Sequence, residues 1–186
     1  IVLAVPAGIA TTALYYAVNK VIRHSRGYLW SSFWHSFKTN MKQGAFVTLI
    51  VAAAVVLVGL DGYIMYQFAK AGEKSGVLYV VFFVLMLVVI AWAIYVFPYM
   101  ARFENSTKLI LKNSALMAIG NLPKTFMALM FFLACCIGTY LLPVVAIISP
   151  ALGMLLLNYI LEGVFERYMS DEDREAENER NQEFYN

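Results

Sequence analysis

The sequence ARFENSTKLILKNSALMAIGNLPK, residues 101–124, lies between two long uncharged segments of the chain, 77–101 and 125–161. Further uncharged segments cover residues 1–19 and 43–60. A helix that crosses the ~30 Å hydrocarbon core of a bilayer needs about 20 mostly apolar residues, and each segment is long enough to supply one. The apolar residues run continuously, without the period of two residues typical of membrane β-barrels. The pattern therefore predicts an all-α, polytopic helical membrane protein.

The composition indicates the same class of protein. Of the 186 residues, 61% are hydrophobic and only 14% are charged, whereas soluble domains carry about 25% charged residues. A soluble domain of this size could not bury so much apolar surface, so the lipid bilayer is the expected surrounding. The net charge is only +2, which gives no basic field that would favour nucleic acid as a partner.

We predict five membrane spans, at about 1–22, 44–69, 77–101, 125–142 and 150–168. Pro143 and Pro150 divide the last apolar block into two helices, because proline interrupts the backbone hydrogen bonds of a helix. The spans form a single transmembrane domain over residues 1–169. The remaining residues, 170–186, contain seven acidic residues and two arginines and form an acidic hydrophilic tail.

Two amphipathic helices are predicted to lie in the membrane interface. The first, 28–43, has Trp30 and Trp34 on one side and Lys38 and Lys42 on another. Trp and Tyr together with Lys and Arg are typical of the membrane–water boundary. This segment is either a membrane anchor whose lysines extend towards water or a surface that binds a partner.

The second amphipathic helix is predicted within 102–124. Glu104, Lys108 and Lys112 recur every four residues and form one polar line, with the acid before the bases as helices prefer. Apolar residues recur on the opposite side, and the helix is expected to end at Gly120, Asn121 and Pro123. A two-faced helix joined to membrane spans is expected to lie at the surface with its apolar side towards lipid. It is the leading candidate for binding a protein partner.

The distribution of charge predicts the orientation of the chain. Segment 20–42 carries five basic residues and no acid, and segment 102–124 carries four basic residues against one acid. The segment at 70–76 has two lysines and one Glu, and the turn at 143–149 has no charge. An excess of Lys and Arg in short loops marks the cytoplasmic side. Five alternating spans then place Ile1 outside and the C-terminus in the cytoplasm.

Three polar residues are predicted to lie within or near the membrane: Asp61, Asn158 and Glu162. If the helix continues past Gly62, Asp61 lies within the membrane thickness, where a carboxylate is costly and usually functional. If the helix ends at Gly62, Asp61 is an ordinary interfacial acid. Glu162 is expected to form an ion pair or to pack between helices.

The chain offers little support for enzyme chemistry. There is no nucleophile–histidine–acid set, no phosphate-binding loop and no pattern of metal ligands, so no enzyme activity, metal or cofactor is expected. Cys135 and Cys136 are adjacent and cannot form an ordinary disulfide with each other, which favours a packing role.

The two ends of the chain share a weak pattern. Pro6-Ala7, Tyr15 and Arg23 match Pro150-Ala151, Tyr159 and Arg167 at a constant offset of 144 residues. The match suggests a duplicated unit, as in many transport proteins. Coincidence among apolar residues is the alternative reading.

Several segments together resemble one family of bacterial membrane proteins. They are ATTALYY at 10–16, FWHSFKTNMKQ at 33–43, ARFEN at 101–105, Lys112-Asn113, and NLPKT at 121–125. The chain resembles the YesL-type family of unknown function over nearly its whole length. Members have a further apolar stretch upstream, so we expect a segment before Ile1. Family genes commonly lie beside genes for sugar-uptake ABC transporters, which implies the bacterial plasma membrane and a role near carbohydrate uptake.

The stretch 104–123 also partly matches the cytoplasmic coupling helix of ABC permease subunits. That pattern has Glu-Ala-Ala, then Gly six residues after the Glu, and then Leu-Pro. Glu104 and Leu122-Pro123 have the right separation, but Asn105-Ser106 replaces Ala-Ala and Ile110 replaces the Gly. An interfacial helix ended by Gly and Pro explains the same residues.

Two functional hypotheses follow. In the first, the protein is an accessory or regulatory subunit for carbohydrate ABC uptake that binds permease or ATPase subunits. The candidate partner-binding residues are Lys38, Lys42, Arg102, Glu104, Asn105, Lys108, Lys112, Asn113 and Pro123. In the second, it is a small transporter or channel that acts as a homo-oligomer, with Asp61, Asn158 and Glu162 lining a path. The first is favoured because a path for a hydrophilic substrate needs more polar groups than the spans contain.

Overall fold

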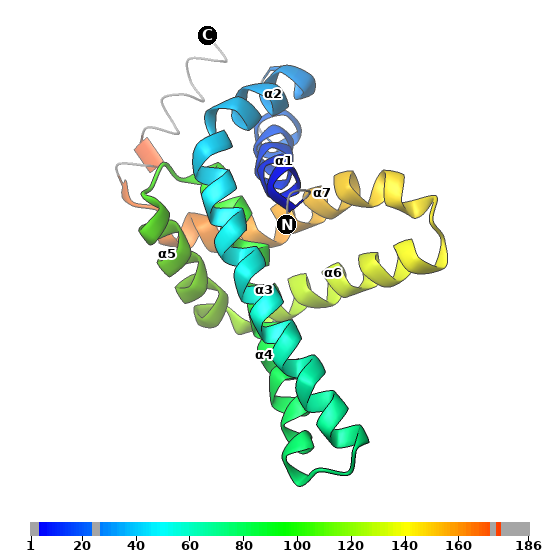
Figure 1. Cartoon of the computed structure of the whole chain (residues 1–186). Coiled ribbons are helices and arrows are strands. Elements are labelled where there is room, and N and C mark those ends of the chain that lie inside the picture. The colour runs from blue at the N-terminus through cyan, green and yellow to red at the C-terminus, as the bar shows by residue number, and fades with distance from the viewer. Residues whose placement is uncertain (1–3, 24–26, 172–173, 176–186) are drawn as a thin grey trace.

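The computed structural model describes residues 4–23, 27–171 and 174–175 of the chain, and within these ranges it contains helices and no strand. Seven α-helices, a π-helix and a 3₁₀-helix make up this part (Figure 1). In chain order they are α1 (Ala4–Ala17), η1 (Val18–Arg23), α2 (Leu29–Thr39), α3 (Met41–Lys70), η2 (Lys74–Leu78), α4 (Tyr79–Arg102), α5 (Thr107–Gly120), α6 (Leu122–Leu141) and α7 (Val145–Tyr168). The predicted all-α membrane fold is confirmed.

Four helical segments in the described ranges are long and apolar enough to cross a membrane: Met41–Lys70, Lys74–Arg102, Leu122–Leu141 and Ile148–Tyr168. They correspond to the last four of the five predicted spans. The described part of the first predicted span, 1–22, is the 14-residue helix α1 followed by η1. Tyr15 and Ala17 of α1 are completely buried in the protein. A span at 1–22 therefore stays a prediction.

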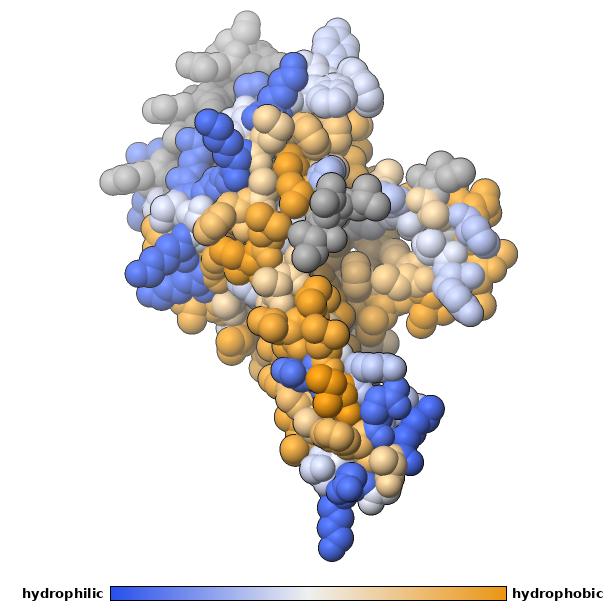
Figure 2. Space-filling model, in the orientation of Figure 1, coloured by the Kyte–Doolittle hydropathy of each residue, from blue (hydrophilic) through white to orange (hydrophobic). Residues whose placement is uncertain are grey.

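The helices form two hairpins that diverge from a common base (Figure 1). The hairpin of α3 and α4 projects from the body, and the hairpin of α6 and α7 runs across it. In α3 the buried residues lie between Gly44 and Val51, and in α4 between Ala91 and Met100. Hydrophobic side chains cover much of the projecting part, and hydrophilic ones gather at its tip and at the opposite end of the molecule (Figure 2). This surface is suited to a bilayer between the two hydrophilic ends.

The core lies where α1, α4 and α7 meet, around the completely buried ring of Phe165. The rings of Tyr15, Tyr95 and Tyr99 approach this ring edge-on, with centroids 6.2 to 6.5 Å away. Phe103 contacts it in the same way at 5.8 Å. Edge-to-face contacts between aromatic rings are favourable beyond the burial of their area, so Phe165 holds the three helices around one point.

Several predicted boundaries are wrong. Helix α7 begins at Val145, not at 150, and the chain turns at 142–144. Pro150 lies inside α7, where it removes one backbone hydrogen bond, a loss that membrane helices tolerate. The interfacial helix predicted at 28–43 ends at Thr39, because Asn40 has a non-helical backbone and Met41 already begins the spanning helix α3.

Helices α1 and α3 approach each other closely at a glycine. A Cβ atom added to Gly8 would overlap Thr48 Oγ1 and would lie 2.8 Å from a ring carbon of Phe97. On the facing side, a Cβ added to Gly44 would lie 3.1 Å from Ile9 Cγ1. Small residues allow helix backbones to approach in this way in membrane proteins. The position of α1 against α3 therefore depends on the absence of a side chain at Gly8.

We expect Gly8→Ala to lower the free energy of unfolding by about 1–3 kcal/mol, because the new methyl group has no space between α1 and α3. Thermal unfolding in detergent, followed by tryptophan fluorescence, measures the change. Gly153→Ala in α7 is the matched control, since a Cβ there meets nothing within 4 Å. Equal stability of the two variants would contradict this account of the α1–α3 contact.

Candidate functional site

Glu162 is the centre of a polar cluster inside the protein. Its side chain is completely buried in α7. The hydroxyl of Tyr15 in α1 donates a hydrogen bond to Glu162 Oε1 over 2.9 Å, and Asn19 Nδ2 in η1 donates to the same oxygen. Arg102 Nε, at the end of α4, donates to Glu162 Oε2 over 3.2 Å. One carboxylate thus joins four helical elements.

The turn of helix at Val18–Arg23 is π-helical, a form that often occurs at functional sites. Asn19 lies in this turn and Tyr15 lies four residues earlier. Both side chains reach the same carboxylate oxygen, so this edge of α1 and η1 is occupied by Glu162. Sequence reasoning did not identify Tyr15 or Asn19 as its partners. The only available signal was that Tyr15 lies in one of the segments that resemble the YesL-type family.

Glu162 and Arg102 form an ion pair that is largely shielded from solvent. The exposed fractions of the two side chains are 1% and 14%. Removing two charges from water costs several kcal/mol per ion, and only good geometry with further hydrogen bonds offsets that cost. Tyr15 and Asn19 supply those bonds to the carboxylate. The ion pair that is one of the two roles expected of Glu162 is therefore present. Its basic member, Arg102, is one of the residues predicted to bind a partner.

Asn158 lies one turn before Glu162 on α7 and is only 4% exposed. Its Nδ2 atom is buried and has no hydrogen-bond partner among the described residues. Such an orphan donor costs free energy unless a water molecule or a bound group accepts its hydrogen bond. Asn158 thus extends the polar site along α7 by one helical turn.

A second internal network holds α5 against α4. Asn105 Nδ2 and Asn113 Nδ2 donate hydrogen bonds to the Tyr99 hydroxyl over 3.0 and 2.9 Å. Trp92 Nε1 donates to Ser114 Oγ over 3.1 Å. Asn105 and Asn113, both predicted to bind a partner, therefore have internal bonds that position α5.

The NLPKT segment is anchored in the same way. Asn121 Nδ2 donates to the Tyr168 hydroxyl over 3.2 Å, and Thr125 Oγ1 lies 2.9 Å from the Tyr95 hydroxyl. Thr125 Oγ1 also donates to the carbonyl of Ala118 over 2.7 Å. These contacts join the start of α6 to α4, α5 and α7.

The remaining predicted partner-binding residues are exposed: Lys38, Lys42, Glu104, Lys108, Lys112 and Pro123. The predicted polar line of three charges is wrong, because α5 begins at Thr107 and Glu104 precedes it. The backbone of Phe103 is extended, and its ring packs on Tyr99 with centroids 4.7 Å apart. Helix α4 ends at this extended residue, and Glu104 lies in the loop that connects α4 to α5.

Asp61 is separate from the Glu162 cluster. Helix α3 continues to Lys70, so the alternative in which the helix ends at Gly62 is wrong. Asp61 is exposed on the half of α3 beyond Val51, where no residue of that helix is buried. The hydrogen bonds of Glu162 given above come from α1, η1 and α4. The structure therefore does not bring together the three residues of the predicted path.

The described residues contain no group of three or more His, Cys, Asp or Glu side chains that could hold a metal ion. Cys135 and Cys136 both carry free thiols. The Glu162 cluster can bind and orient polar groups, and it ties helices together.

Comparisons with known proteins give one match. A family described as "Protein of unknown function, DUF624" matches residues 1–62, one third of the chain. These residues include Tyr15 and Asn19 of the Glu162 cluster. No curated protein and no solved structure matches the chain.

We expect Glu162→Gln to lower the free energy of unfolding by about 3–5 kcal/mol, because it removes the carboxylate charge from the shielded ion pair with Arg102. Denaturation of the purified protein in detergent measures this loss. The double variant Arg102→Gln with Glu162→Gln should lose much less than the sum of the single variants. Glu73→Gln, in the exposed turn before η2, is the control and should change stability little. Additive losses would mean that the two charges do not act as a pair.

Proposed function

We propose that this chain is a YesL-type protein of the bacterial plasma membrane that serves carbohydrate uptake as an accessory or regulatory subunit. It binds a permease or ATPase subunit of an ABC importer through the exposed face of α5 and the loop before it. The resemblance of the ARFEN and NLPKT segments to the YesL-type family supports the link to sugar uptake. The match of residues 1–62 to a family of unknown function is consistent with this assignment.

The observation that carries the proposal is the mixed character of the exposed face of α5. Lys108 and Lys112 lie one turn apart on this face. Beside them Leu116 and Ile119 are 58% and 66% exposed. A protein partner can bind the lysines and the large apolar side chains together. A surface of this kind supports the docking of a protein partner.

The same helix is held firmly from behind. Its inner face buries Ile110, Ser114 and Met117, and Ile110 and Ser114 are completely buried. Gln43 Nε2 of α3 donates to the carbonyl of Asn105 over 2.8 Å and fixes the loop before α5. A surface that is rigid before binding loses little entropy when a partner docks.

The partial match to the coupling helix of ABC permeases fits the same surface. Glu104 and Pro123 are exposed at the two ends of the segment, and Leu122 is 65% exposed. A coupling helix is a short exposed helix that must fit into a groove on an ATPase subunit. Glu104 lies in the loop before α5. The charged residues of α5 that would contact a groove on an ATPase subunit are therefore its lysines.

The proposed orientation places α2, α5 and the C-terminus in the cytoplasm. The excess of Lys and Arg in 20–42 and 102–124 supports it. The turn between α3 and α4 then lies outside. A permease or ATPase subunit could reach α5 from the cytoplasm in this arrangement.

The alternative function, a small transporter or channel that acts as an oligomer, is favoured by one observation. Asn158 holds a buried donor that has no partner among the described residues, one helical turn before Glu162. This alternative requires sugar or ion flux in proteoliposomes of the purified protein alone. Flux that falls with Asn158→Leu but not with Asp61→Asn would support it over the accessory role.

We expect Lys108→Glu with Lys112→Glu to reduce co-purification of ABC permease or ATPase subunits about tenfold or more, because like charges across an interface cost several kcal/mol. Affinity purification in mild detergent from the native host, with sugar present and absent, provides the measurement. Lys70→Glu with Lys74→Glu makes the same charge change at the far end of the α3–α4 hairpin and should leave co-purification unchanged. If no such subunit accompanies the wild-type protein, the proposal is wrong.

Labelling of single cysteines tests the orientation, in a chain with Cys135 and Cys136 replaced by serine. A membrane-impermeant maleimide should label Ser75→Cys, in η2, in intact cells. It should label Ser106→Cys, in the loop before α5, only after the membrane is opened. Both serines are exposed, so access alone decides the result. The reverse pattern would place α5 outside and exclude docking to a cytoplasmic ATPase.

A further inference from the structure

Helix α2 is held at the membrane surface by its connection to α3. Asn40 alone separates the last residue of α2, Thr39, from Met41, the first residue of the spanning helix α3. The backbone nitrogen and the side-chain Nδ2 of Asn40 both donate hydrogen bonds to the carbonyl of Ser36. These bonds stabilise the turn between α2 and α3. The uncharged segment 43–60 of α3 begins within one helical turn of Asn40, so we place α2 at the boundary between lipid and water.

The aromatic side of α2 is not part of the protein core. The buried residues of α2 are Ser32 and Ser36, whose small side chains allow the helix to lie close to its neighbours. Trp30 is 71% exposed and Trp34 is 40% exposed, and their rings contact each other with centroids 5.7 Å apart. Indole rings prefer the level of the lipid headgroups. This side of α2 is therefore suited to contact lipid.

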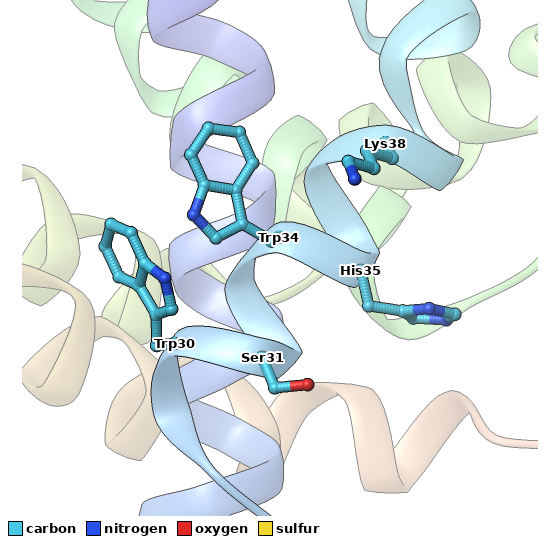
Figure 3. A pocket seen from close by; sticks show the side chains of 5 residues that line it. All are labelled: Trp30, Ser31, Trp34, His35 and Lys38. Carbon is cyan, nitrogen blue, oxygen red and sulfur yellow. The ribbon is translucent and has the colours of Figure 1, made fainter.

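A line of polar side chains runs beside the two indoles. Ser31, His35 and Lys38 follow one another at intervals of four and three residues. Figure 3 shows the indole rings on one side of α2 and Ser31 and His35 on the other. Together the five residues line an open hollow of about 720 Å³. The hollow is thus a shallow surface over α2 with the indoles along one edge and the polar residues along the other.

A second lysine approaches from the preceding helix. Lys20 Nζ lies 5.6 Å from the centre of the Tyr16 ring, and this ring lies 6.4 Å from the ring of His35. Lys20, Tyr16 and His35 therefore form a continuous surface from η1 to α2. No acidic residue occurs anywhere in 20–42. The positive charge of this surface favours the binding of an anion.

We propose that this surface binds the phosphate headgroup of an anionic phospholipid, with Lys20, His35 and Lys38 facing the phosphate and Trp30 and Trp34 facing the glycerol region. Phosphate chemistry is shared with soluble anions, but the indole wall and the location of α2 at the membrane surface favour lipid. Lys38, predicted from sequence to bind a protein partner, has its role here. The inference does not depend on the accessory role of α5.

Native mass spectrometry of the detergent-solubilised protein tests the site. The probes are phosphatidylglycerol and phosphatidylcholine with identical acyl chains, offered in equal amounts. The wild-type protein should retain phosphatidylglycerol in preference to phosphatidylcholine. Lys20→Gln with Lys38→Gln should reduce this preference by about fivefold for each charge removed, since each lysine near an anionic surface contributes about 1 kcal/mol.

The chain offers a matched control at the other end of the molecule. Lys70 Nζ lies 5.1 Å from the centre of the Tyr66 ring, much as Lys20 lies over Tyr16, and Lys74 is exposed nearby. Lys70→Gln with Lys74→Gln makes the same change in net charge and should keep the preference for phosphatidylglycerol. An equal loss in both double variants would show attraction by net charge alone and would overturn the proposal.

Two further outcomes are decisive. Inorganic phosphate, added in excess, should not displace the bound phosphatidylglycerol, and displacement would identify a site for soluble anions instead.

In nanodiscs, phosphatidylglycerol with brominated acyl chains should quench tryptophan fluorescence more than brominated phosphatidylcholine does. Trp30→Phe with Trp34→Phe should abolish that difference. A difference that survives in this variant would mean that the lipid binds elsewhere.

Discussion

The buried carboxylate of Glu162 is the constraint on which the packing of this protein depends. A charge removed from solvent costs several kcal/mol unless other groups compensate it, and here the compensation comes from α1, η1 and α4. A shift of α7 by one turn would separate Glu162 from all three partners. The ring of Phe165, three residues further along α7, contacts aromatic residues of the same helices. Electrostatics and packing thus specify one register of α7.

Polar residues in this protein serve two different purposes. Arg102, Asn105 and Asn113 form bonds within the protein and fix the positions of α4, α5 and α7. Lys38, Lys108 and Lys112 point away from these networks and are exposed. Helix α5 is therefore mounted rigidly, with its inner face occupied and its outer face exposed. This arrangement is compatible with the protein docking that we propose at α5.

The segments that resemble the YesL-type family belong largely to the internal networks. Tyr15 and Arg102 bind Glu162, Asn105 binds Tyr99, and Asn121 and Thr125 anchor the start of α6. A motif whose residues stabilise a scaffold indicates the fold and says little about chemistry. The proposed functions therefore rest on exposed residues outside these networks, where charge and apolar surface occur together.

The membrane class and the approximate position of four spans followed from the amino-acid pattern alone, because uncharged runs of that length are stable only in lipid. The pattern also predicted that Glu162 would form an ion pair or pack between helices. Which residues contact Glu162 became known from the packed fold, since Tyr15, Asn19 and Arg102 lie 147, 143 and 60 residues away along the chain. The fold likewise shows that α5 starts only at Thr107, after the extended residue Phe103, and that α7 starts at Val145, before Pro150. The pattern of residues within a segment indicates whether lipid or water surrounds it. Which distant residues contact each other depends on how whole helices pack.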